Sequence, residues 1–236
     1  QVTDQFSPRP VSRAFLRAAE EAGHPPTADF NRGDNEGVGL YQVTQFHDAA
    51  RRGERCSAAA AYLHPVMQRP NLRVITRAQA TAILFEGRRA SGIDLRQGRQ
   101  TQRVLARREV ILSAGAFGSP QLLMLSGIGP ADHLRQNGIQ PLIDLPAVGA
   151  NLQDHLDVIL SWTSRDTDSF GFSLRAGLRM PGHLRNWLRH GRGMLTTPFA
   201  EGAGFLRSNP GVDRPDLQLH FVIGVVDDPA RRLHWG

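Results

Sequence analysis

The stretch SAGAFGSPQLLMLSGIGP, residues 113–130, joins a run of small residues to a compact block of large apolar ones. The preceding residues 108–112, REVIL, have the apolar pattern of a β-strand. Small side chains leave the main chain open to a ligand, and the N–H groups that begin a helix attract anions. The stretch therefore predicts a strand, a turn and a helix, with a turn that can hold an anionic or nucleotide ligand. An ordinary α/β crossover also needs a tight turn, and spacing alone favours that structural explanation.

The same stretch predicts a short, buried helix. Ser119 is a favourable N-cap residue, and Pro120 suits the first helical position, where an N–H would be unpaired anyway. Leu122–Leu125 are all large and apolar, so we expect the helix to be buried nearly all round. Gly127 is expected to end it. Because a helix of about two turns is unstable alone in water, packing must hold it in place.

The composition indicates a globular protein. Of the 236 residues 40% are hydrophobic, the net charge is +6, and all 28 basic residues are arginine. No basic strand interleaved with aromatic residues accompanies this charge, so we expect no nucleic-acid partner. No apolar run reaches the roughly 18 residues that a transmembrane helix needs. The single cysteine, Cys56, excludes an internal disulfide, favours a reducing compartment and is expected to be a packing residue.

Periodicity predicts two helices early in the chain and several strands after them. One helix is expected over Ser12–Gly23 with Ser12 as its cap, and a second follows Ser57 until Pro65 ends it. Gly87–Arg89 is expected to form a hairpin turn, and residues 170–192 look helical. Strand patterns occur at NLRVIT (71–76), ATAILFE (80–86), ASGIDL (90–95), TQRVLARREVIL (101–112), DVILSWT (157–163) and DLQLHFVIGVV (216–226). The nearly continuous apolar run in ATAILFE suggests a strand covered on both faces.

The 113–130 stretch resembles the second sequence signature of the glucose–methanol–choline (GMC) family of flavin-dependent oxidoreductases. Further segments are similar to that family in the same order along the chain: DFNRGDNEGVGLYQVT (29–44), GERCSAAAAYLHP (53–65), NLRVITRAQATAILFEG (71–87), AVGANLQDHLDV (147–158) and DLQLHFVIGVVDD (216–228). Within the family, the choline dehydrogenases and bacterial alcohol dehydrogenases are the most similar.

The resemblance implies a mixed α/β (α+β) fold: part of a Rossmann-like FAD-binding domain together with part of an antiparallel-sheet substrate domain. Residues 57–156 would be the middle portion of the FAD-binding domain. Residues 1–56 would be a substrate-domain or linker portion, and residues 157–236 a further portion of the substrate domain. The chain itself contains no G-x-G-x-x-G fingerprint, which the family carries near its N-terminus.

The resemblance also implies which residues approach FAD. The main chain at Ala80 would recognise the adenine, although the family often has Val there. The cofactor-binding candidates carried over in this way are Ala80, Ser113, Ala114, Gly115, Asn151 and Asp154. Asn151 and Asp154 are expected to be either near-cofactor or structural groups. The catalytic histidine of the family lies near its C-terminus and has no counterpart here, so we expect no catalytic residue in this chain.

The histidines carry weaker indications. Nine are present, but none forms an H-E-x-x-H motif or an i, i+4 pair, so we expect no metal site. His155 beside Asp154 could be a polarised pair or a structural histidine. His220 shares a strand face with Gln218 and Val222; either it contacts substrate or it is structural.

The main functional hypothesis is a fragment of an FAD-dependent oxidoreductase acting on CH–OH groups. It would oxidise a primary, choline-like alcohol to an aldehyde with hydride transfer to the flavin. The alternative is a stand-alone, non-catalytic binding or interaction module on the same fold. The start QVTDQFSPRP has neither Met nor a signal-peptide pattern, so we expect an internal fragment whose partner is the remainder of the parent chain. We expect a cytoplasmic protein and leave open an association of the parent with the membrane periphery.

Overall fold

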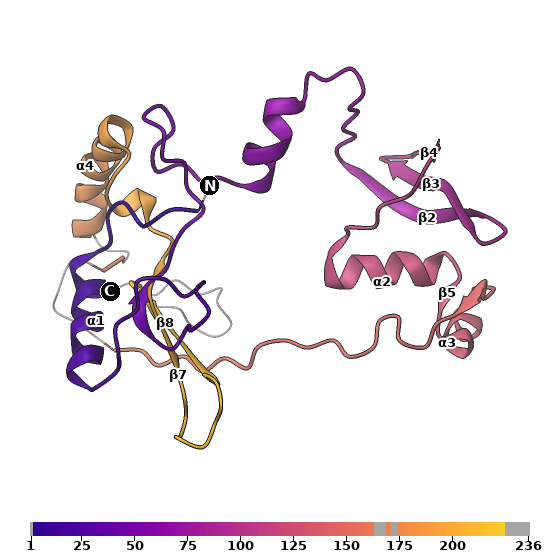
Figure 1. Ribbon diagram of the computed structural model, residues 1–236. Helices are drawn as coiled ribbons and strands as arrows, with labels where there is room; N and C mark the ends of the chain where they lie inside the picture. Colours follow the sequence, from indigo (N-terminus) through magenta and orange to yellow (C-terminus); the bar gives the residue numbers. More distant parts are fainter. Residues whose placement is uncertain (1, 163–168, 171–173, 225–236) are drawn as a thin grey trace. The chain divides into compact units, whose positions relative to one another are not determined.

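The structure is a computed structural model that describes residues 2–162, 169–170 and 174–224 (Figure 1). The chain forms two compact units. Unit 1 combines Gln1–Arg69 with Val158–Gly236, and unit 2 is Pro70–Asp157.

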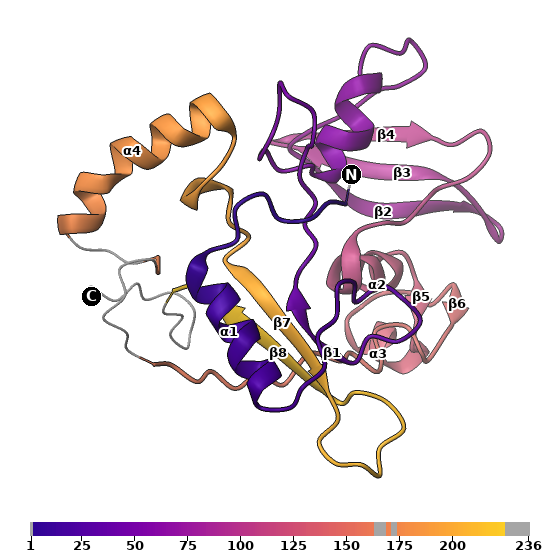
Figure 2. The same ribbon diagram turned by 60° about the vertical axis from the view of Figure 1, so that its left-hand side comes forward.

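Unit 1 contains a three-stranded antiparallel sheet in the order β1 (Gly37–Leu40), β7 (Ala200–Leu206), β8 (Leu217–Val222). Helix α1 (Pro10–Glu21) packs against this sheet (Figure 2). The Phe15 ring of α1 stacks on the Phe221 ring with centroids 4.6 Å apart. The central strand carries Gly202 opposite Phe15, where an added Cβ would lie 3.1 Å from the ring, so glycine permits this close packing.

Helix α1 begins two residues earlier than the sequence predicted, and Ser12 is not its cap. Arg9 is the N-cap residue, and Ser12 lies fully buried inside the helix. The carboxylate of Glu201, on β7, accepts hydrogen bonds at its Oε2 from the Arg9 main-chain N–H and from the Ser12 hydroxyl, both at 2.7 Å. Glu201, which is distant in sequence, thus accepts the hydrogen bonds offered by donors at the start of the helix. A local sequence pattern does not reveal such a partner.

The remaining elements of unit 1 are a π-helical turn η1 (Ala59–Leu63), the 3₁₀ turns η2 (His64–Val66) and η3 (Met194–Thr196), and helix α4 (Leu174–His190). Ser57 Oγ accepts the Ala60 N–H at 3.2 Å, as a capping side chain does, although the N-cap residue of η1 is Ala58. Ala60 is buried with Phe46 and Cys56. Unit 1 extends to Arg69, whereas the resemblance implies an FAD-binding domain that begins at residue 57.

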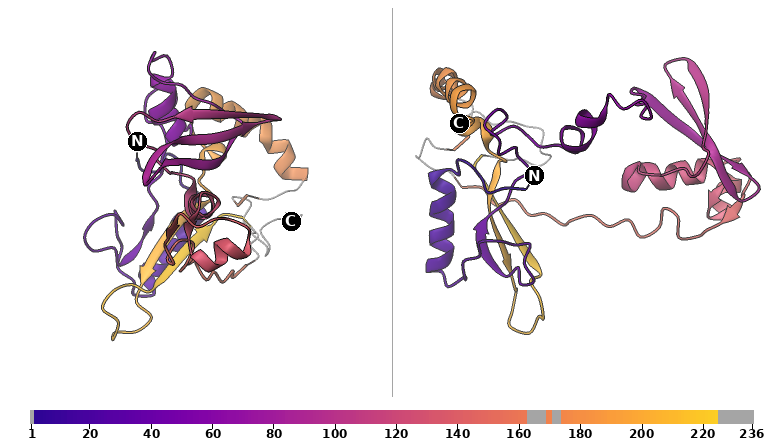
Figure 3. Two further views of the ribbon diagram at one scale, coloured as in Figure 1. Left: turned by 90° about the vertical axis from the view of Figure 1, so that its right-hand side faces the viewer. Right: turned by 45° about the horizontal axis from the view of Figure 1, so that its top comes forward.

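Unit 2 contains the antiparallel meander β2 (Ala78–Glu86), β3 (Arg89–Gln97) and β4 (Gln100–Leu105) (Figure 3). The hairpin predicted at Gly87 is confirmed, with Gly87 at a φ of +62°. Helices α2 (Gly115–Leu125) and α3 (Ala131–Gln136) follow, with a short parallel pair of β5 (Ile128–Gly129) and β6 (Ile143–Asp144). The mixed α/β class with antiparallel sheets is therefore confirmed.

Three predicted strands are not strands in the structure: residues 71–76, 108–112 and the described part of 157–163 run outside any sheet. Ile111, in the second of these, is 78% exposed. A strand needs a neighbouring strand to pair its main-chain groups, and the described chain places none beside these segments. The expected two-sided burial of ATAILFE is also wrong, because only Ile83 of β2 is buried. Thr163, residues 171–173 and Val225–Val226 of the predicted elements lie outside the described residues.

Candidate functional site

The start of α2 is an open main-chain turn, which we call the α2 turn (residues 113–116). Ala114 is the N-cap residue, and Gly115 has a φ of +81°. The helix therefore begins well before Ser119, whose predicted N-cap role is wrong. Ser119 lies inside the helix, and its hydroxyl accepts the Ala114 N–H at 3.0 Å. The side chain thus stabilises the turn from within the helix.

The main chain of the α2 turn is accessible. Ser113, Ala114, Gly115 and Ala116 are all exposed, and a Cβ built on Gly115 would meet nothing within 4 Å. The first N–H groups of an α-helix have no intrahelical acceptor and carry the positive end of the helix dipole. The α2 turn can therefore donate main-chain hydrogen bonds to an anionic or polar ligand.

The opposite end of α2 is fixed to the β-meander. Ser126, the C-cap residue, accepts the Ile83 N–H of β2 at 2.8 Å and donates its hydroxyl to Leu122 O at 2.6 Å. This clamp holds α2 beside β2 (Figures 1 and 3). Gly127, with a φ of +85°, ends the helix as predicted. The apolar helix is less buried than expected, since Leu122 is its one buried residue.

Ala80 lies on β2, an edge strand of the meander. It pairs with Leu95, and the register shifts immediately after it, between Ala80 and Ala82. Such a bulge alters the direction of the main chain, and the outer side of an edge strand faces no other strand of its sheet. The geometry therefore leaves main-chain groups of β2 open to a ligand. β2 is also the strand that Ser126 ties to α2.

Asn151 and Asp154 lie in an exposed segment that follows Gly149. A Cβ on Gly149 would lie 3.5 Å from Met124 Cε, so the chain runs along α2 just before Asn151. Asn151 has a left-handed φ of +55°. The Asp154 carboxylate accepts the main-chain N–H of His155 at 2.8 Å. This hydrogen bond between Asp154 and His155 thus involves the backbone of the histidine and not its ring.

Unit 1 carries a polar group that the sequence analysis saw only in part, the Tyr41 trio of Tyr41, Gln218 and His220. Gln218 Nε2 donates to the Tyr41 hydroxyl at 2.9 Å, and that hydroxyl lies 2.9 Å from His220 Nδ1. Burial raises the pKa of Tyr41 above its ordinary value, and the Gln218 hydrogen bond opposes this in part. Tyr41 was missed because it follows β1 in a segment without strand alternation.

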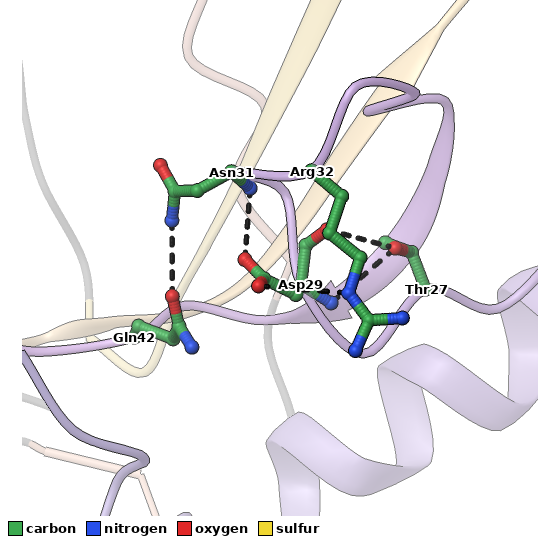
Figure 4. A network of polar contacts seen from close by, with 5 residues as sticks. All are labelled: Thr27, Asp29, Asn31, Arg32 and Gln42. Atoms are coloured by element: carbon green, nitrogen blue, oxygen red, sulfur yellow. Dashed lines mark hydrogen bonds and ion pairs between the residues drawn. The ribbon is translucent and has the colours of Figure 1, made fainter.

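A second polar network closes the loop before and after β1 (Figure 4). The Asp29 carboxylate accepts the Asn31 N–H at 2.8 Å, and Asn31 Nδ2 donates to Gln42 Oε1 at 3.0 Å. Thr27 and Arg32 complete it through longer contacts to Asp29, at 3.4 and 3.7 Å. Among the described residues no group of three or more His, Cys, Asp or Glu side chains is arranged to hold a metal ion. The network therefore stabilises the loop around β1.

Comparison with protein families identifies this combination of elements. The family described as GMC oxidoreductase matches residues 1–157, which is more than half of the chain. The chain belongs to the GMC oxidoreductase family. The resemblance noted from the sequence is thereby confirmed.

Curated GMC relatives are similar over almost the whole chain. An alcohol dehydrogenase [acceptor] of Pseudomonas putida is 43% identical over 237 residues, which cover 100% of this chain and 42% of the relative. A mitochondrial choline dehydrogenase of Mus musculus is 43% identical over 223 residues, covering 94% of this chain and 36% of the relative. The chain thus spans about two fifths of the length of these relatives.

Solved structures agree with this fold. An FAD-dependent oxidoreductase from Chaetomium thermophilum matches 86% of this chain and 36% of its own, with a TM-score of 0.77 and 28% identity. A formate oxidase matches 95% of this chain and 42% of its own with a TM-score of 0.79; its 23% identity supports the shared fold alone.

Among the described residues no helix combines the length and the apolar character that spanning a membrane requires.

Proposed function

We propose that this chain is part of a flavoprotein that oxidises an alcohol to a carbonyl compound, and that unit 2 supplies main-chain contacts to FAD. The observation that carries the proposal is the α2 turn. Its small, exposed residues and the free N–H groups at the start of α2 suit a ligand that is recognised by backbone rather than by side chains. The family relationship supports FAD as that ligand.

The residues present fit a dinucleotide. Gly115 leaves open space where any side chain would project, and Ser113 and Ala114 add little bulk beside it. Ala80 offers main chain on an edge strand that is tied through Ile83 and Ser126 to the same helix. Asn151 and Asp154 extend the candidate contact region along the chain that passes α2. In this proposal these residues bind and orient the cofactor.

When bound, FAD supplies an acceptor for the hydride that leaves the alcohol carbon. The chain's own contribution on the substrate side is the Tyr41 trio. Since Tyr41 keeps its proton at neutral pH, its hydroxyl can donate to His220 Nδ1, which leaves Nε2 of His220 as an N–H donor. We propose that this donor holds a substrate oxygen. The general base lies in the rest of the protein.

The substrate is proposed as a primary alcohol of choline type, because curated relatives named choline and alcohol dehydrogenases are similar over 94–100% of this chain. In the same proposal, residues 57–156 belong to the FAD-binding domain and the flanking segments to the substrate domain. We retain the cytoplasm as the predicted location.

The test uses the complete protein purified from its own gene. We expect a bound flavin with its visible absorption, and loss of that absorption when choline or a primary alkanol is added without oxygen. Bleaching by choline but not by the alkanol would identify the substrate class. A protein that neither retains FAD nor regains flavin absorption on reconstitution would contradict the proposal and favour a binding module.

A further inference from the structure

Unit 1 contains a cavity whose charged lining is mainly basic. The cavity lies between the loop before Cys56 and the C-terminal end of α4, is half-open and has a volume of about 650 Å³. Its ionisable lining residues are Arg52, Glu54, Arg189, His190 and Arg192. This volume is in the range of sites that hold small molecules, and three arginines favour an anionic occupant.

The carboxylate of Glu54 does not balance these arginines. Glu54 is the one carboxylate among the described lining residues, and Arg51 Nε donates to its Oε2 at 3.2 Å. Arg51 is not among the residues that line the cavity. Because Glu54 is paired with this additional arginine, the cavity keeps the positive charge of its own three.

One of the lining arginines carries a donor without an acceptor. Arg52 Nε is buried and has no hydrogen-bond partner within the described structure. A buried N–H of a charged group that stays unpaired keeps the full cost of its desolvation. An acceptor oxygen of a ligand in this cavity would remove that cost.

The main chain around the cavity is held by close contacts. A Cβ on Gly53 would lie 2.7 Å from Gly191 O, and one on Gly191 would collide with Arg52 O. Both glycines have positive φ, at +77° and +58°. Asn186 Nδ2 donates to Arg192 O at 3.0 Å. The backbone that carries Arg52 and Arg192 is therefore fixed before a ligand binds, which lowers the entropic cost of binding.

The dipole of α4 explains only part of the basic lining. Basic residues in the last turn of a helix offset its negative end, and this accounts for Arg189 and His190. Arg192 follows the end of α4, and Arg52 comes from a loop far earlier in the chain. Their presence in the same cavity therefore calls for a further anion.

We propose that this cavity binds a small molecule that carries a phosphate group. A phosphate monoester has about −1.5 to −2 charges at neutral pH and three terminal oxygens, whereas a carboxylate offers one charge and two oxygens. Several guanidinium groups can bind such a phosphate at once. Trp187 and Leu188 also line the cavity, so an organic ester gains apolar contacts that inorganic phosphate lacks. This binding does not depend on the proposed oxidation of an alcohol.

The test is isothermal titration calorimetry of the complete protein at constant ionic strength, with glycerol 3-phosphate, inorganic phosphate and acetate as the probes. We expect glycerol 3-phosphate to bind with a Kd of about 1 mM or lower and inorganic phosphate to bind more weakly. Acetate should bind about tenfold more weakly than glycerol 3-phosphate or not at all. Tighter binding of inorganic phosphate than of the ester would contradict an organic ligand, and acetate binding equal to that of the ester would contradict the phosphate class.

Two variants locate the binding in the cavity. Arg189→Gln and Arg192→Gln should each weaken binding of glycerol 3-phosphate by about tenfold, because each removes a charge-assisted hydrogen bond. Arg214→Gln is the matched control, since it removes the same charge from unit 1 at a side chain that is 82% exposed, and it should bind as the wild type does.

Circular dichroism melting and flavin content, measured on each variant, separate this site from folding and from cofactor binding. We expect both to be unchanged in the two cavity variants. The proposal is overturned if the folded wild-type protein binds neither phosphate, or if both cavity variants bind as the wild type does. It is equally overturned if the cavity variants lose flavin together with phosphate binding, which would assign these arginines to the cofactor.

Discussion

Tyr41 and His220 are 179 positions apart in the chain, yet the Tyr41 hydroxyl lies 2.9 Å from His220 Nδ1. Their rings are also stacked, with centroids 5.6 Å apart and planes inclined by 30°. Gln218 donates to the same hydroxyl from the β8 position two residues before His220. The Tyr41 hydroxyl can donate its proton to His220 Nδ1, and we expect this contact to favour the His220 tautomer with hydrogen on Nε2.

Replacing Tyr41 by Phe should therefore release the His220 tautomer. We expect the ¹⁵N NMR pattern of His220 to change from a predominantly Nε2–H form to a mixture. Loss of two partly exposed hydrogen bonds should cost about 1 kcal/mol of unfolding free energy. Gln218→Leu, which removes the donor but keeps the Tyr41 hydroxyl, should preserve the tautomer. An unchanged NMR pattern in Tyr41→Phe would show that Tyr41 does not orient the ring.

Glu201 should be among the most sensitive positions of unit 1. Its carboxylate is fully buried and accepts from Arg9 N–H, from Ser12 Oγ and, at Oε1, from Thr197 Oγ1 at 2.7 Å. Glu201→Gln replaces one of the two acceptor oxygens by an NH₂ group, so at least one of these donors loses its acceptor, and we expect a loss of about 1–3 kcal/mol. Glu36→Gln, at a partly exposed ion pair with Arg207, should cost about 0–1 kcal/mol. Urea unfolding of the two variants measures the difference, and equal losses would contradict the capping role of Glu201.

Ser126→Ala should loosen α2 from β2. The variant leaves the buried Ile83 residue with an N–H that has lost its acceptor, at a cost of about 1–3 kcal/mol. Ser119→Ala, which removes the acceptor of Ala114 N–H at the exposed end of the same helix, should cost less because water can replace it. Hydrogen exchange of the Ile83 amide reports the clamp directly. Unchanged protection in Ser126→Ala would refute the clamp.

The β3–β4 hairpin of unit 2 should lose stability at acid pH, because Asp94 on β3 pairs with Arg103 on β4. The Arg103 guanidinium hydrogen-bonds the Asp94 carboxylate at 2.8 and 2.9 Å and lowers the pKa of Asp94 below its ordinary value of 3.8. A lowered folded pKa means that the stabilisation is present above the ordinary value and is lost as pH falls through the folded pKa.

Asp94→Asn should remove this part of the acid dependence, measured from neutral pH to values well below the ordinary pKa of 3.8. Arg103→Gln should have the same effect, and the double variant should add nothing further. Melting temperatures across that pH range give the comparison. Additive losses in the double variant would show that the two side chains act independently.

Local signals explain which elements the sequence predicted correctly. The β2–β3 hairpin was foreseen because both strands and the Gly87 turn are adjacent in sequence, and Ser57 was recognised because a cap acts three residues away. The start of α1 was misread because Glu201, 189 positions from Ser12, satisfies it. Residues 108–112 have strand-like side chains, but pairing requires partners that the described chain does not place beside them.

The residues of the candidate site also divide into those that the sequence predicts and those that depend on packing between distant segments. Ser113, Ala114 and Gly115 are consecutive small residues, so their open turn could be anticipated from the sequence. Tyr41 could not be, since its role depends on β8 aligning Gln218 and His220 with it. The tie from Ser126 to β2 likewise depends on packing between two distant segments.

The most direct measurement of the central claim compares FAD affinity of the complete protein carrying Gly115→Val or Gly87→Val. Both glycines have positive φ and open space around an added Cβ, so the backbone strain of about 1–2 kcal/mol should be similar. If the main chain of the α2 turn lies against FAD, Gly115→Val should weaken binding at least tenfold by flavin titration, whereas Gly87→Val should bind as the wild type does. Wild-type affinity in a folded Gly115→Val protein would contradict the account.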